Sequence, residues 1–355
     1  MSKQASTSSF SQSSVSPPPT RFTPLELRHF HDEYTLECQL KQFTPQTLYC
    51  RGDVFTKFFW FLDKRGFDGV SASEIKQFIG YMATGHTEAG GRWGNPRLVK
   101  AMKPVTMVGY YRTLHAFFNW MVEEEIVTVS LMARVKAPIY RPEVKQPVSR
   151  EVITLLLEAA KRSQSPERNE AILLVLLDTG VRASELCGIK MKDVDLAQRT
   201  LRILGKGQKY RTCYLGRATT KALMKHLRTR AASASATSSA TPACVAAPDD
   251  ALFVGAANAY GGPLTKSGLF QLLKRLAKAA GVPTCGPHAL RRTFAVEFLR
   301  ASNGNVFTVQ HLLGHTDLTQ TKLYCAISEA DTENQHRQFS PADRLKRAAK
   351  EKTPY

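Results

Sequence analysis

Residues 136–148 interrupt the chain with three prolines, Pro138, Pro142 and Pro147, set among basic side chains. Proline has no backbone N–H and fixes φ, and the stretch shows no hydrophobic periodicity, so a helix does not run through it. It therefore predicts an extended linker between two domains. With 355 residues in all, each part is long enough to bury a core of its own.

The part before the linker, residues 23–135, has the spacing of amphipathic helices. One apolar stripe recurs at steps of seven, four and three residues on a helix that begins near Pro45, and it consists of Leu48, Phe55, Phe59 and Leu62. Ser71, followed three residues later by Glu74, resembles a capping box. This pair predicts a shorter helix that continues through Met82.

A loop and a last helix complete this part. Residues 85–103 are rich in glycine and in basic residues, which predicts a loop. The helix after it has an apolar face made of Val108, Tyr111, Leu114, Phe118, Met121 and Val122. Because the many aromatic side chains stand at helical spacing, they favour a packed core over base stacking. We therefore expect a small bundle of about four helices.

The part after the linker combines helices with a few strands. We expect helices at residues 149–161, 168–177, 264–280, 287–300 and 306–313. Two strand-like runs, 194–204 and 210–215, flank Gly205–Lys209 and predict a hairpin with Lys206 at its tip, and residues 252–254 suggest a further short strand. The fold class is thus mainly α, with an α+β second domain that contains a small antiparallel sheet.

The remaining segments are of low complexity. Residues 231–248 carry no charge, so we expect a flexible excursion. Residues 1–22 are expected to form a disordered tail, since they are rich in serine and proline and lack the hydrophobic segment of a secretory signal. The seven cysteines are scattered without a C-x-x-C pair, which argues against a disulfide framework and a zinc site. The scattered cysteines also favour a reducing compartment, so we expect a cytoplasmic protein. No apolar run reaches the ~18 residues of a transmembrane helix, so we expect no membrane contact.

The charge balance indicates a polyanionic partner. The chain has 49 Lys and Arg against 30 Asp and Glu, a formal net charge of +19. Nucleic acid is the partner that this excess favours. Charge alone leaves open a generic basic protein or one that binds a membrane surface.

Six side chains of the second part together suit the cleavage of a phosphodiester. They are Arg182, Lys206, His288, Arg291, His315 and Tyr324. Guanidiniums stay protonated and donate paired hydrogen bonds, which suits phosphate oxygens. Lysine can protonate a departing oxygen, and tyrosine can hold the phosphate in a covalent bond. Each residue alone is more commonly structural or solvated, so the chemical interpretation depends on their occurrence together and in this order.

The motifs that carry these residues are Thr179–Leu186, Gly205–Lys209, His288–Arg291, Leu313–His315 and Tyr324. They resemble the tyrosine recombinases, also called the phage integrase family, and the resemblance extends over residues 24–330. It implies a helical core-binding domain at 23–135 and a catalytic domain at 149–334, which grip duplex DNA as a C-shaped clamp. Residues 335–355 would form a tail with an inter-protomer helix. The short N-terminal tail points to the two-domain type, without an arm-binding domain.

The resemblance also implies roles for single residues. Arg182 and Arg291 would clamp the phosphate, Lys206 would be the general acid, Tyr324 the nucleophile, His288 a proton-transfer partner of the tyrosine, His315 a phosphate ligand and Glu185 a support. Neither a metal nor a cofactor is expected, because the phosphotyrosyl bond stores the energy needed for resealing. His311 is expected to play no part. Candidate phosphate contacts elsewhere are Arg51, Arg97, Lys100, Lys103 and Arg112, for each of which a solvated face is an equal explanation.

The implied function is site-specific DNA recombination through a 3′-phosphotyrosyl intermediate, for integration or excision of a mobile element or for resolution of replicons. The implied partners are double-stranded DNA recombination sites, further copies of the chain in a tetramer, and a second recombinase or a DNA-bending protein, all at the bacterial nucleoid. Two rivals remain. A type IB topoisomerase shares the residue types, but the helical N-terminal part argues against it. A DNA-binding regulator without catalysis would lack at least one catalytic residue.

Overall fold

The computed structural model describes residues 21–86, 90–141, 145–205, 209–237, 247–255, 262–302, 305–314, 336–337 and 340, with the side chains of 233–237 left aside. The chain divides into two compact units, Met1–Glu143 and Val144–Tyr355. This division falls within residues 136–148, where the prolines predict a linker. Among the described residues, no helix is long and apolar enough to cross a membrane.

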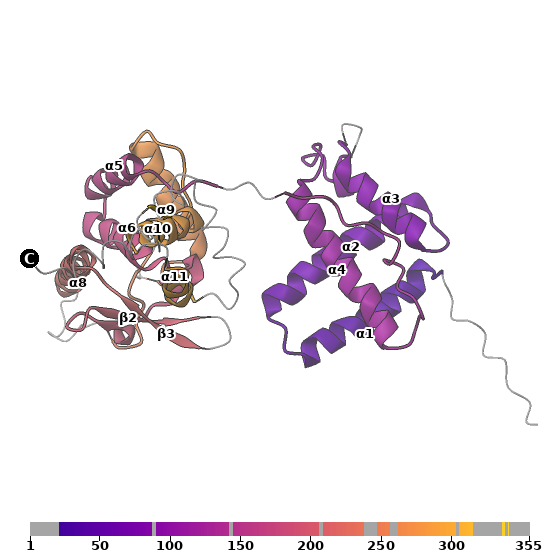
Figure 1. Ribbon diagram of the computed structural model, residues 1–355, viewed down its shortest axis with the longest axis horizontal. Coiled ribbons are helices and arrows are strands. Elements are labelled where there is room, and N and C mark those ends of the chain that lie inside the picture. Colours follow the sequence, from indigo (N-terminus) through magenta and orange to yellow (C-terminus); the bar gives the residue numbers. More distant parts are fainter. Residues whose placement is uncertain are drawn as a thin grey trace, which may run out of the picture. The chain divides into compact units, whose positions relative to one another are not determined.

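The first unit is a helical bundle (Figure 1). Its elements are α1 (Pro24–Leu40), α2 (Pro45–Arg65), α3 (Ala72–Ala83), the 3-10 turn η1 (Arg92–Gly94) and α4 (Pro104–Glu123). Proline opens α1, α2 and α4, where its missing N–H costs no hydrogen bond. The predicted capping box is present: Ser71 and Glu74 bond each other's backbone at the start of α3. Both the four-helix expectation and this boundary are confirmed.

Aromatic side chains form the core of this unit. The largest fully buried ones are Phe55, Phe58, Phe61, Phe78, Phe117 and Phe118. They meet edge to face, as the rings of Phe55 and Phe117 do at 5.0 Å and 75°. The expectation that these residues pack rather than stack on bases is confirmed. The buried face of α4 is centred on Tyr110 and Phe117, so the predicted members Val108 and Tyr111 lie at its margin and are half-buried.

The second unit consists of helices around a small sheet. Its elements are α5 (Arg150–Lys161), α6 (Pro166–Thr179), α7 (Ala183–Gly188), η2 (Met191–Asp193), β1 (Val194–Asp195), β2 (Thr200–Leu204), β3 (Tyr210–Tyr214), α8 (Arg217–Thr237), α9 (Lys266–Ala279), α10 (Pro287–Ala301) and α11 (Val306–Leu313). The sheet is antiparallel in the order β1-β2-β3. The apolar helix α6 packs against α5, α8 and α10 (Figure 1), because most of its side chains are buried. The mainly α fold with a small antiparallel sheet is confirmed.

Two strand predictions were wrong in detail. The run 194–204 is two strands, because Asp195 accepts a hydrogen bond from the backbone N–H of Gln198 at 2.8 Å and closes a turn after β1. Residues 252–254 form no strand: the pairing there consists of the isolated bridges Lys190↔Ala251 and Val254↔Pro263.

The prediction for residues 231–248 was wrong at its start. Helix α8, which the sequence analysis missed, begins at Arg217 and runs into this tract as far as Thr237. Its buried side chains include Leu223 and His226, whose ring nitrogen lies 3.2 Å from the carbonyl oxygen of Leu252. Once the helix is anchored there, the alanines that follow continue it at little cost. Residues 238–246 of the tract lie outside the described residues. In the predicted tail 1–22, Phe22 is buried and pairs with Val70, so the disorder expected there was wrong at its last residue. Residues 1–20, and all of the predicted tail 335–355 except 336–337 and 340, lie outside the described residues.

Candidate active site

The turn between α6 and α7 positions Arg182. Gly180 ends α6 in the left-handed conformation, with φ of 59°. A Cβ at this glycine would lie 2.5 Å from Cδ1 of Phe294 and 2.8 Å from Cδ2 of Leu313, so no other residue fits without movement. Arg182 then occupies the N-cap position of the short helix α7. The turn therefore lies directly against α10 and the end of α11.

Arg291 links three of the predicted motifs. This residue of α10 is 2% exposed. Its Nη1 donates to the carbonyl oxygen of Gly180 at 2.5 Å, and its Nη2 donates to that of Leu313 at 2.8 Å. One buried guanidinium thus joins the turn before Arg182 to the turn before His315. The sequence predicts these residues as members of one site, and the described residues bring Arg182, Arg291 and the Leu313 turn together.

Glu185 neutralises the interior of this site. Its side chain accepts hydrogen bonds from Arg182, through Nη1 and the backbone N–H, both at 2.8 Å. It also accepts from Arg211, at 3.0 and 2.8 Å. Burial alone would raise the pKa of Glu185, but the hydrogen bonds from Arg211 and Arg182 lower the pKa to about 2. The carboxylate is therefore charged at every pH at which the protein would act.

Arg211 is the residue that the sequence analysis missed. It lies on β3, and its Nε donates to the carbonyl oxygen of Leu312 at 3.2 Å. Its partners lie 26 and 101 residues away along the chain. No motif marks it, and the only signal in the sequence is an arginine within a strand-like run after Gly205–Lys209.

His288 stands in the first turn of α10, three residues before Arg291 and thus on the same face of the helix. It is exposed. Desolvation by its surroundings, followed by the positive charges of Arg291, Arg182 and Arg292, lowers its pKa. The imidazole is therefore neutral near pH 7 and can accept a proton.

Lys206, His315 and Tyr324 lie outside the described residues. Their roles stay predictions, although the segments that lead to two of them are in place. The backbone N–H of Gly205 bonds the carbonyl oxygen of Lys209 at 2.8 Å, which closes the connection between β2 and β3. Gly314 ends α11 with φ of 63°, immediately before His315. His311, expected to play no part, is an exposed residue of α11.

The candidate DNA contacts belong to the first unit. Arg97, Lys100, Lys103 and Arg112 are exposed, and the first three line a hollow of about 440 Å³ together with Lys57 and Arg92. Arg51 is instead half-buried, and its guanidinium donates to the hydroxyl of Tyr34 and lies 4.5 Å from the ring centre of Phe43. Its contact with DNA stays a prediction, and it would compete with these packing contacts.

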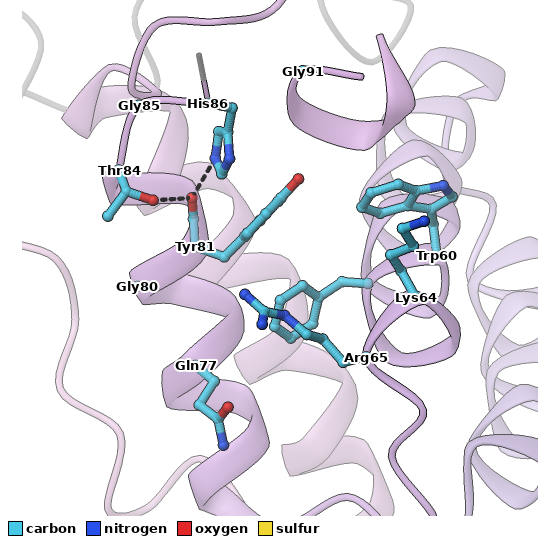
Figure 2. Close-up of a pocket in the computed structure, with 11 residues that line it drawn as sticks. Trp60, Lys64, Arg65, Gln77, Gly80, Tyr81, Thr84, Gly85, His86 and Gly91 are labelled. Carbon is cyan, nitrogen blue, oxygen red and sulfur yellow. Dashed lines mark hydrogen bonds between the residues drawn. The ribbon is translucent and has the colours of Figure 1, made fainter. Parts of the chain in front are cut away.

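A second hollow of the first unit, of about 670 Å³, lies between α2 and α3 (Figure 2). Trp60, Lys64 and Arg65 reach it from α2, and Tyr81 from α3. It contains none of the predicted catalytic residues. Its two cations add to the basic surface of this unit. In the described part of the chain, no cluster of His, Cys, Asp and Glu could hold a metal ion.

The sequence matches known proteins. The model of the phage integrase family matches residues 147–331, more than half of the chain. Tyrosine recombinase XerC of Roseiflexus sp. (strain RS-1) is 28% identical over 308 residues, which cover 86% of this chain and 89% of that protein. Tyrosine recombinase XerC of Roseiflexus castenholzii (strain DSM 13941 / HLO8) is 30% identical over 231 residues, 64% of this chain and 69% of that protein.

Solved structures share the fold. XerH site-specific recombinase bound to palindromic difH substrate superposes with a TM-score of 0.62 at 19% identity, over 84% of this chain and 80% of that one. The Tn1549 transposon integrase in complex with transposon right end DNA gives the same TM-score at 18% identity, over 90% of this chain and 100% of that one. From the family model, the relatives and the linked motifs, the chain belongs to the phage integrase family, the tyrosine recombinases.

Proposed function

We propose that this chain is a site-specific recombinase that cuts and rejoins DNA strands through a 3′-phosphotyrosyl intermediate on Tyr324. The observation that carries the proposal is the buried guanidinium of Arg291, which bonds Gly180 and Leu313 and so joins the motifs of Arg182 and His315. Membership of the tyrosine recombinase family supports it. The relatives are named for the same activity.

In the proposed reaction the oxygen of Tyr324 attacks the scissile phosphorus and the bond to the 5′ oxygen breaks. The proton of the tyrosine passes to a base, for which the neutral imidazole of His288 is suited. The 5′ oxygen takes a proton from Lys206. Attack by a 5′ hydroxyl reverses these steps and reseals the strand, so no cofactor enters the balance.

The arginines stabilise the charge that develops on the non-bridging oxygens. Arg182 is half-buried, and its Nη1 donates to Glu185, which fixes the guanidinium. Its other guanidinium N–H groups remain for a phosphate. Positioned donors of this kind are worth roughly 3–4 kcal/mol each in the barrier. His315 would donate to the same phosphate. This division of roles is part of the proposal.

The assembly is proposed on the same basis. The first unit would bind duplex DNA as the core-binding domain and the second would catalyse, so that both grip the duplex. Four protomers would exchange two strand pairs in turn, with a second recombinase or a DNA-bending protein as candidate partners. We place the activity on DNA in the cytoplasm. Integration, excision and replicon resolution are the candidate tasks.

A random-sequence duplex library tests this function without knowledge of the target. The wild-type chain is incubated with the library, and DNA that stays attached to protein in SDS is sequenced. A defined sequence, attached through its 3′ phosphate, is expected for the wild type and none for Tyr324→Phe. Adducts without sequence preference would favour a type IB topoisomerase. Sequence-specific binding without any adduct would favour a regulator.

A further inference from the structure

Arg211 is held in one orientation by all three nitrogens of its guanidinium. Nη1 and Nη2 bond the two oxygens of Glu185, and Nε bonds the carbonyl oxygen of Leu312. The side chain is only 13% exposed. A planar guanidinium with this set of acceptors is rigid, and it joins β3 to α7 and to the end of α11.

Glu185 has no acceptor capacity left. Each of its oxygens receives one N–H from Arg211 and one from Arg182, the latter from Nη1 at 2.8 Å and from the backbone at 2.8 Å. A carboxylate offers about four lone-pair positions, and here four are used. Arg182 therefore gives the carboxylate a single side-chain N–H. Among the described residues no acceptor is present for its remaining guanidinium N–H groups, and its side chain is 31% exposed.

Loss of Arg211 would change how the acceptor positions of Glu185 are shared between the two arginines. Glu185 is buried, with a side chain only 4% exposed, and would regain two empty acceptor positions. The nearest cation is Arg182, which could then turn and bond both oxygens in a bidentate pair. The N–H groups used in that pair would no longer be offered to a phosphate.

The second contact of Arg211 concerns the end of α11. A Cβ built on Gly314 would lie 3.1 Å from Cδ and 3.2 Å from Nε of Arg211, so the arginine packs closely against this glycine. Gly314 immediately precedes His315. The hydrogen bond to Leu312 and this packing together fix the turn at the end of α11, which comes immediately before His315 in the sequence.

We propose that Arg211 is a positioning residue for strand cleavage. Arg211 fills two acceptor positions of the Glu185 carboxylate, so that Arg182 keeps its remaining guanidinium N–H groups for the scissile phosphate. Arg211 also holds the turn that precedes His315. Arg211 itself does not touch the DNA. The proposal rests on the recombinase function proposed above.

The test measures cleavage and binding separately, on a nicked duplex that carries the sequence selected from the random library. Single-turnover cleavage at saturating DNA gives the rate constant, and fluorescence anisotropy gives Kd. Arg211→Gln is expected to lower the rate constant by about 10²-fold, as removal of one oriented donor does. Its Kd should stay within about threefold, because no phosphate contact is lost. The matched control is Arg202→Gln on the neighbouring strand, where the arginine is exposed and lies 4.8 Å from the ring centre of Tyr210, and cleavage should be unchanged.

The double variant Glu185→Gln/Arg211→Gln separates positioning from a general loss of structure. A neutral amide has one oxygen and cannot bind Arg182 in a bidentate pair, so the double variant should cleave at least about tenfold faster than Arg211→Gln alone. A double variant that cleaves no faster would overturn the proposal. So would an Arg211→Gln variant that cleaves normally but binds DNA more weakly.

If circular dichroism shows that Arg211→Gln is unfolded, Arg211→Lys takes its place. Lysine reaches one oxygen of the carboxylate, so cleavage should be about tenfold slower, and adding Glu185→Gln should restore the rate. A rate that is not restored contradicts the proposal in the same way. A wild-type chain that forms no adduct through Tyr324 would refute the recombinase function and the proposal with it, whereas normal cleavage by the Arg211 variants would refute the proposal alone.

Discussion

Among the described glycines of the second unit, Gly180 should be the most sensitive to substitution. An L-residue at its φ of 59° costs about 1–2 kcal/mol. A Cβ there also meets Phe294 at 2.5 Å and Leu313 at 2.8 Å, and overpacking of this kind costs about 1–3 kcal/mol. Gly180→Ala should therefore reduce the free energy of unfolding by about 2–5 kcal/mol. For a unit of this size that is a fall in Tm of about 4–20 °C.

Two other glycines separate the cost of backbone strain from the cost of overpacking. Gly281 has φ of 66° and no atom within 4 Å of an added Cβ, so Gly281→Ala reports the backbone strain alone, about 1–2 kcal/mol. Gly188, in α7, has neither a positive φ nor a close atom, so Gly188→Ala should not lower Tm. The three variants are melted and followed by circular dichroism. If Gly180→Ala melts within about 2 °C of Gly281→Ala, the packing argument for the turn before Arg182 is wrong.

Four further predictions concern the chemistry and the loops. Lys206→Ala should slow cleavage of ordinary DNA, and a substrate with sulfur at the bridging 5′ position should recover much of the rate; equal loss on both substrates would remove Lys206 from the role of general acid. His315→Ala should impair cleavage while His311→Ala leaves it near normal, and equal losses would show that the motif has been placed wrongly. Glu185 has a pKa lowered from 4.5 to about 2, so it stabilises the fold fully above pH 4.5 and the contribution is lost as the pH falls through 2. An acid titration of Glu185→Gln should lack that loss, and an unchanged acid limb would contradict the assigned hydrogen bonds. Replacing residues 239–245 by a short Gly/Ser linker should change Tm by less than about 5 °C, since loop length has a weak effect on stability, and a larger fall would show that the segment packs.

Much of the fold follows from local sequence alone. Helix α2 begins at Pro45 and α3 at the capping box of Ser71, as the sequence predicts, because the residues that start a helix act within a few positions of each other. The failure at residues 231–248 had a cause outside that tract. The start of the 231–248 tract is helical because buried residues of α8 outside the tract anchor it, and no property of the tract itself carries that information.

The residue types of the candidate active site could be predicted from the sequence, since Arg182, His288 and Arg291 stand in short motifs. Glu185 was readable for the same reason. The hydrogen-bond partners of those residues could not be predicted from the sequence. The guanidinium of Arg291 is directed at the carbonyl oxygens of Gly180 and Leu313, which lie 111 and 22 residues away.

Arg211 shows most clearly what the tertiary structure alone decided. Its partners, Glu185 and Leu312, come from separate helices, and they meet only because β3 lies against the ends of both. Periodicity and capping depend on neighbours in the chain, so the sequence by itself determined most of the helices, though not α8, and the family motifs. The saturation of one buried carboxylate by two arginines depends on distances between segments that the chain brings together only on folding, and there the sequence pattern carries no signal.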